Sequence, residues 1–201
     1  MRSEKATLVK PTKADFFKAF EFISEDKGYS VILKFFTEIW ERFSSCPAST
    51  RFHDPGPADW KGAYPGGLLD HTYNVVKTCI NLSDLFKMDD GFKGSLIKCA
   101  YLHDIGKMGN DTTECYLVNK KDDADKKPYY WNDISPCDHE LRSIWWCQKK
   151  GIILSEEEII AILHHAGPYR LDHGYINPDS EHPLTIMLFS ADNLVAKILG
   201  I

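Results

Sequence analysis

The chain has 201 residues, of which 43% are hydrophobic and 12% aromatic, and this predicts a single compact domain over residues 1–201. Its net charge of −5, with both signs interspersed, excludes a protein that coats nucleic acid through phosphate contacts alone. The six cysteines form no C-x-x-C pair, the N-terminus lacks the apolar stretch of a secretory signal, and no apolar run approaches the roughly 20 residues of a membrane span. We therefore expect a cytoplasmic protein with reduced thiols and no membrane partner.

Helices dominate the expected elements from the N-terminus onward. Thr12 can cap a first helix, whose apolar side chains follow at helical spacing up to Ile23. A second helix lies between Gly28 and Cys46. The segment 46–67 contains too much Pro and Gly for a regular element, so we expect a long ordered loop there.

The rest of the chain also predicts helices, with one exception. Four further segments keep the helical period of apolar residues: 68–88, 95–107, 156–166 and 183–199. Ser135-Pro136 begins another helix, which Gly151 ends. The short aromatic and β-branched runs at 115–121 and 128–133 predict a β-hairpin. The expected fold class is all-α with a small β-hairpin insertion.

Ionisable residues recur on these helices, most of them near a helix end. They are His71, His103, Asp104, His139, His164, His165 and Asp192. Any single histidine has an ordinary explanation as a core residue hydrogen-bonded to a carbonyl. Asp192 is harder to explain in this way, because a carboxylate on the inner stripe of a helix is costly to bury unless it is paired or binds a metal.

Together these residues offer ligands for two metal ions. One ion would have two imidazoles and two carboxylates, from His71, His103, Asp104 and Asp192. A second ion would share Asp104 and add His139 and one residue of the pair His164 and His165, since adjacent helical residues point about 100° apart. Imidazole and carboxylate together favour Mn, Fe, Co, Ni or Zn over Mg or Ca, so we expect one or two divalent transition-metal ions.

Three segments have the form of known sequence motifs: 66-GGLLDHTYNV-75, 100-AYLHDIGK-107 and 190-SADNLVAK-197. They resemble the first two motifs and the last motif of the HD-domain superfamily of metal-dependent phosphohydrolases. The residues PASTRFH at 47–53, and the order H-x-G at His165, are closest to the HD domain of the YhaM-type 3'-to-5' exoribonucleases and to small phage and bacterial HD proteins. The resemblance covers residues 47–198 and implies an HD-domain helical bundle, on which the helices of residues 1–45 pack.

The resemblance also implies an activity. It predicts hydrolysis of a phosphomonoester or phosphodiester bond, of a nucleotide or short oligonucleotide, by a metal-activated water, with Asp104 as the bridging catalytic carboxylate and His165 as the metal ligand beside His164. Lys107 would hold a phosphate oxygen, although a solvated lysine at a helix end is the alternative on spacing alone. Further substrate-binding residues are expected around the mouth of the site: Arg51, His53, Tyr169 and Arg170.

Two other classes of function stay open at this point. The HD-x-G-K string also occurs in HD-fold mixed-valence di-iron oxygenases, where the same ligands hold iron for O₂ chemistry. A non-catalytic nucleotide-binding regulatory protein is the other alternative, and failure to retain any metal would favour it. The expected partner is a phosphorylated small molecule or short nucleic acid, and the oligomeric state is left open.

Overall fold

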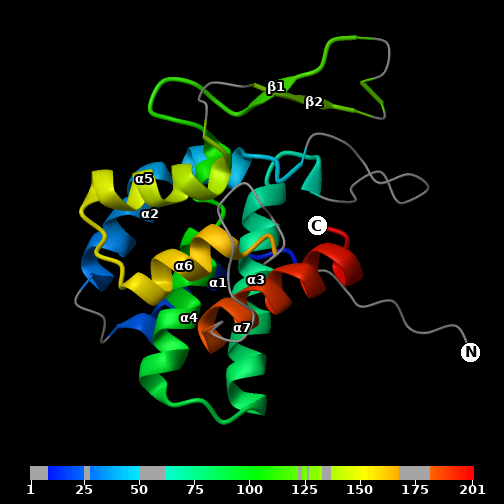
Figure 1. Ribbon diagram of the computed structural model, residues 1–201. Helices are drawn as coiled ribbons and strands as arrows, with labels where there is room; N and C mark the ends of the chain where they lie inside the picture. The colour runs from blue at the N-terminus through cyan, green and yellow to red at the C-terminus, as the bar shows by residue number, and fades with distance from the viewer. Residues whose placement is uncertain are drawn as a thin grey trace, which may run out of the picture.

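The computed structural model describes most of the chain, namely residues 9–24, 28–49, 62–121, 124–125, 127–132, 137–167 and 182–201. These residues are mostly helical and include one small antiparallel hairpin (Figure 1). The expected fold class, all-α with a small β-hairpin, is confirmed at this level. Across the described part of the chain, no helix is long and apolar enough to cross a membrane.

The first helix begins where the sequence predicts. Thr12 caps α1 (Lys13–Lys18): its hydroxyl accepts the backbone N–H of Asp15, and the Asp15 carboxylate accepts the backbone N–H of Thr12. The chain then tightens into the 3₁₀ helix η1 (Ala19–Ile23), so the α-helical part is shorter than expected. Helix α2 (Tyr29–Ser45) follows and agrees with the sequence.

Helices α3 (Gly67–Leu85) and α4 (Asp90–Leu102) form an antiparallel pair, and the turn that joins them lies at the lower edge of the molecule in Figure 1. The expected helix over 95–107 was wrong at both ends. The Asp89 carboxylate accepts the N–H of Phe92 and starts α4 earlier. At the other end the backbone leaves the helical path at Asp104, and the 3₁₀ turn η3 (Ile105–Met108) follows.

The remaining helices are α5 (His139–Lys150), α6 (Glu156–His164) and α7 (Pro183–Leu194), and the π-helical turn η6 (Val195–Leu199) extends α7. Asp138 caps α5, whereas the expected start at Ser135-Pro136 lies outside the described residues. Gly151 ends α5 in the left-handed conformation, as expected. Ser155 and Glu158 form a capping box at the start of α6, where the sequence predicts a helix.

The hairpin is shorter than the sequence suggested. Strands β1 (Tyr116–Val118) and β2 (Tyr129–Trp131) pair antiparallel, with Tyr116 opposite Trp131. Figure 1 shows the two strands extending beyond the helical body, next to α2 and α5. The Tyr116 hydroxyl donates to the carbonyl of Ala48, which ties the start of the hairpin to the segment after α2.

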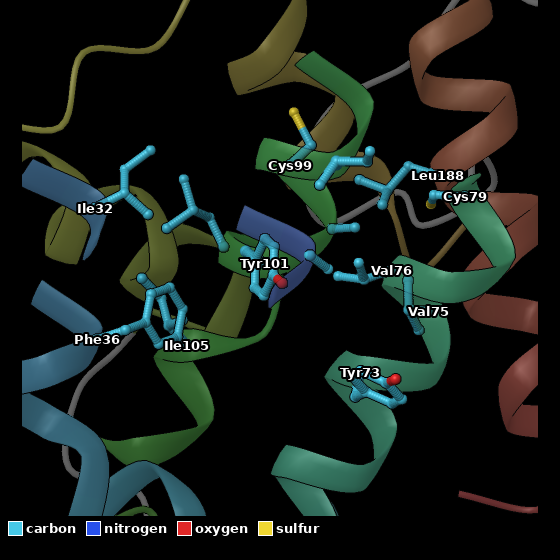
Figure 2. Packing of buried hydrophobic residues seen from close by; sticks show 14 of the residues in the cluster. Ile32, Phe36, Tyr73, Val75, Val76, Cys79, Cys99, Tyr101, Ile105 and Leu188 are labelled. Carbon is cyan, nitrogen blue, oxygen red and sulfur yellow. The ribbon is translucent and has the colours of Figure 1, made fainter. Parts of the chain in front are cut away.

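One hydrophobic cluster joins the N-terminal helices to the others. Tyr101 of α4 lies at its centre, between side chains of α2 on one side and of α3 and α7 on the other (Figure 2). Its hydroxyl donates to the carbonyl of Phe16, so its buried polar atom is satisfied. A buried ion pair between Lys98 and Glu158, 3.0 Å apart, links α4 to α6. Helix α4 therefore packs against both α3 and α6.

Candidate metal centre

Six of the predicted ligand residues come together from separate elements. His71 lies in α3, His103 and Asp104 follow α4, His139 begins α5, His165 follows α6, and Asp192 lies in α7. Four of them are buried, and the side chains of His139 and Asp192 are 17% and 18% exposed. The helices that share the hydrophobic cluster therefore also bring these ionisable groups to one place.

The first group of ligand atoms surrounds the Nε2 atom of His71. This atom lies 3.2 Å from His103 Nε2, 3.3 Å from Asp104 Oδ2 and 3.0 Å from Asp192 Oδ1. His103 Nε2 lies 3.4 Å from Asp104 Oδ2 and 3.8 Å from Asp192 Oδ1. Two carboxylates and a second imidazole therefore lie within 3.3 Å of His71 Nε2.

The second group uses the other oxygen of the same carboxylate. Asp104 Oδ1 lies 3.2 Å from His139 Nε2 and 3.4 Å from His165 Nε2. In each group the ligand atoms of the three residues that include Asp104 all lie within 4.8 Å of one another. Asp104 thus offers one oxygen to each of two neighbouring positions, as a bridging carboxylate would.

Backbone carbonyls set the orientation of three of the imidazoles. The Nδ1 atom of His71 lies 3.0 Å from the carbonyl oxygen of Ile201. The Nδ1 atom of His103 lies 2.8 Å from the carbonyl oxygen of Ala100, and that of His165 lies 2.7 Å from the carbonyl oxygen of Ile162. A carbonyl oxygen only accepts, so Nδ1 carries the hydrogen in each ring. The lone pair of each Nε2 then points at the centre, which is the form that binds a metal.

This arrangement fits a metal ion because, apart from the Lys107 ammonium beside Asp104 Oδ2, the atoms that face the centre are acceptors. With Nδ1 protonated, the lone pairs of His71 and His103 face each other across 3.2 Å, beside two carboxylates. Asp104 Oδ1 is buried and has no hydrogen-bond partner among the described residues. Such a set is stable only around a cation, either a proton or a metal ion. These buried groups could therefore hold a metal ion.

The pKa values in the metal-free centre point the same way. Burial lowers the pKa of His71, but hydrogen bonds to Asp104 and Asp192 outweigh it and raise that pKa to about 9. Burial raises the pKa of Asp192, but the hydrogen bond from His71 lowers it to about 2. Burial also opposes ionisation of Asp104, yet the charge of Lys107 outweighs it and keeps the pKa of Asp104 well below the usual range. The centre therefore attracts positive charge at neutral pH.

Lys107 lies within the centre, and its interpretation as a solvated lysine at a helix end is wrong. Its Nζ is 2.6 Å from Asp104 Oδ2, and its side chain is 18% exposed. It lines a pocket of about 200 Å³ together with His71, Asp192 and Lys197. The ammonium and the first group of ligands thus face the same cavity.

The turn that carries Asp104 and Lys107 packs tightly against α5. A Cβ atom on Gly106 would lie 2.0 Å from the carbonyl oxygen of His139, so only glycine fits at this contact. The Gly106 N–H donates to the Ser143 hydroxyl, which donates in turn to the carbonyl of His103. The sequence analysis missed Ser143, although its position one helical turn after His139 could have indicated it.

Several predicted residues are not part of this arrangement. His164 is buried, but it belongs to neither ligand group of the described residues, whereas its neighbour His165 does. The substrate-binding candidates Arg51, His53, Tyr169 and Arg170 lie outside the described residues. No protein family, curated protein or solved structure was found to match this chain.

Proposed function

We propose that this chain is a metal-dependent phosphohydrolase of the HD-domain superfamily, which cleaves a phosphomonoester or phosphodiester bond of a nucleotide or short oligonucleotide. The observation that supports it most is the environment of Asp104. Its two oxygens lie in two adjacent groups of ligands, and the ammonium of Lys107 contacts one of them. The proposed superfamily rests on the motifs that contain these residues and on the helical fold.

The protein's own groups would have distinct tasks in this reaction. Asp104 would fix the spacing of the two metal positions, and the carbonyl-held imidazoles would keep their lone pairs aimed at them. Divalent transition metals bound there would supply an activated water and positive charge beside the phosphoryl oxygens. No side chain of the protein needs to attack phosphorus, so the residues serve to position groups and to bind charge.

The pocket beside the first ligand group suits an anionic substrate. Lys107 and Lys197 both line it, together with His71 and Asp192. An anionic oxygen that entered would meet the ammonium of Lys107 next to the metal position, where a preorganised positive charge stabilises the transferring group. These contacts favour a phosphorylated substrate over a neutral one.

A screen under anaerobic conditions tests the proposal. The purified full chain, supplied with Mn²⁺, is assayed for release of phosphate or nucleotide from phosphomonoesters, phosphodiesters and nucleoside triphosphates, with Asp104→Ala as the control. We expect turnover that depends on the metal and disappears in the variant. Consumption of O₂ by an iron-loaded protein without anaerobic hydrolysis would favour the di-iron oxygenase. Failure of the wild-type protein to bind any metal would favour a non-catalytic role.

A further inference from the structure

His139 differs from the other three imidazoles in the partner of its Nδ1 atom. The other rings face neutral backbone carbonyls, whereas His139 Nδ1 lies 3.0 Å from the carboxylate oxygen Oε2 of Glu140. The side chain of Glu140 is fully buried. A carboxylate in this place makes an imidazole a stronger ligand than a carbonyl does, because the negative charge increases the electron density at Nε2.

The charges around the two metal positions explain why this partner matters. The first position has a carboxylate of its own, Asp192, in addition to its share of Asp104. The second position has no such carboxylate in direct contact within the described residues, and Asp104 is shared and also paired with Lys107. The carboxylate of Glu140 thus supplies negative charge to the second position, as Asp192 does to the first. It acts on the second position through the ring of His139.

The fold keeps this carboxylate charged and in place. Glu140 lies in the first turn of the twelve-residue helix α5, whose N-terminus is capped by Asp138. The positive end of the helix favours an anion there. Since Glu140 directly follows His139, the helix itself sets the approach of its carboxylate to the ring.

We propose that Glu140 is a positioning residue that acts through His139 and gives the second of two metal positions its affinity. Without the carboxylate charge, the ion held by His139 and His165 is lost, while the ion held by His71, His103 and Asp192 remains. The proposal rests on the metal centre and not on the identity of the reaction.

The variant Glu140→Gln isolates the charge, because the side-chain amide has nearly the same size and shape as the carboxylate. The full chain, stripped with a chelator, is titrated with Mn²⁺ by calorimetry, and the signal of a coupled Mn²⁺ pair is followed by electron paramagnetic resonance. We expect two ions in the wild-type protein. In the variant the first binding constant should stay within about threefold, the second should weaken by roughly 10- to 100-fold, and the pair signal should be lost.

Matched variants separate this role from a general structural one. Glu158→Gln also places an amide in a buried ion pair, the one with Lys98, and should leave the binding of both ions unchanged. In a His139→Ala background the further change Glu140→Gln should have no effect on metal binding, because the residue through which it acts is gone. Glu140→Asp keeps the charge and should hold the second ion more tightly than Glu140→Gln. The Asp variant also serves as the test if the Gln variant folds poorly.

Each outcome decides the matter. Equal weakening of both ions in Glu140→Gln, or unchanged binding of the second ion, would overturn the role of Glu140, and so would an undiminished effect in the His139→Ala background. A wild-type protein that binds one ion or none would overturn the two-position centre itself. Two ions without hydrolysis would leave the role of Glu140 intact and refute only the proposed reaction.

Discussion

Replacing Lys107 with Met should separate the binding of substrate from the binding of metal. The Lys107 ammonium lies 2.6 Å from Asp104 Oδ2, and the Asp104 side chain is 1% exposed. Removing one partner of a buried ion pair costs about 3 to 5 kcal/mol, because the other charge stays buried. The His71 ring, whose pKa is about 9, stays protonated 3.3 Å from the same carboxylate and keeps the loss near the lower end of this range. We therefore expect the metal-free variant to lose about 3 kcal/mol of unfolding free energy.

The same substitution should have a different effect on the metal-loaded protein. Metal ions would neutralise Asp104 in place of the ammonium, so metal content should be maintained, and affinity should rise because a nearby positive charge is gone. Turnover should fall by roughly 30- to 900-fold, which corresponds to the 2 to 4 kcal/mol typical of one preorganised electrostatic contact. Unfolding in urea with and without Mn²⁺, metal analysis and turnover on one preparation measure all three quantities.

Lys93→Met is the matched control for this prediction. Lys93 Nζ also lies 2.6 Å from a carboxylate oxygen, that of Asp84, but the Asp84 side chain is 63% exposed. Solvent weakens such a pair, so its loss should cost about 0 to 1 kcal/mol and leave turnover unchanged. If Lys107→Met behaves like Lys93→Met in stability and turnover, the reasoning about the buried pair and about phosphate binding is wrong.

The geometry of the centre and of the turn beside it leads to four further predictions. His165→Ala should lose metal whereas His164→Ala should keep it, and the reverse result in elemental analysis would exchange their roles. The raised pKa of His71, about 9, stabilises the metal-free fold below the unfolded value of about 6.5, and this contribution should disappear as the pH rises through about 9. Over the same range a metal must displace the proton, so calorimetry should show affinity rising up to about tenfold per pH unit, and pH-independent binding would contradict this. Gly106→Ala forces a Cβ into the backbone of α5 and should lower the free energy of unfolding in denaturant by about 3 kcal/mol. In Gly91→Ala the new Cβ meets only a side-chain oxygen 3.3 Å away, so the free energy of unfolding should stay level or rise by up to about 1 kcal/mol. Equal effects of the two glycine substitutions would refute the close contact.

The sequence predicted elements well where a local signal determines them. Thr12 with Asp15, and Ser155 with Glu158, form capping boxes because both hydrogen bonds lie within four consecutive residues. The predicted start of α4 was wrong because competing signals occur there. Gly91 and Gly94 follow the Asp89 cap and obscure it, although it starts the helix.

The residues around the ligands were harder to predict than the ligands themselves. His71 and Asp192 have side chains suited to metals, so residue type and helical position were enough to name them as candidate ligands. The partner of His71 is the carbonyl of Ile201, 130 residues away along the chain. Because each residue has a backbone carbonyl, the sequence contains no signal for such a partner. Glu140 was overlooked for a related reason, since an acidic residue in the first turn of a helix is common and normally faces solvent.

The ends of α4 and α6 explain why ligands should occur where helices stop. His103 and His165 are the C-cap residues of these helices, and the Nδ1 of each donates to a carbonyl three residues earlier, that of Ala100 or Ile162. The last carbonyls of a helix have no partner within the helix, so each ring satisfies one of them and is held with its Nε2 pointing outward. Two ligands are thus oriented by their own helices alone. His71 lies within α3 and depends instead on the distant Ile201, so its orientation should be the most sensitive of the three to changes elsewhere in the chain.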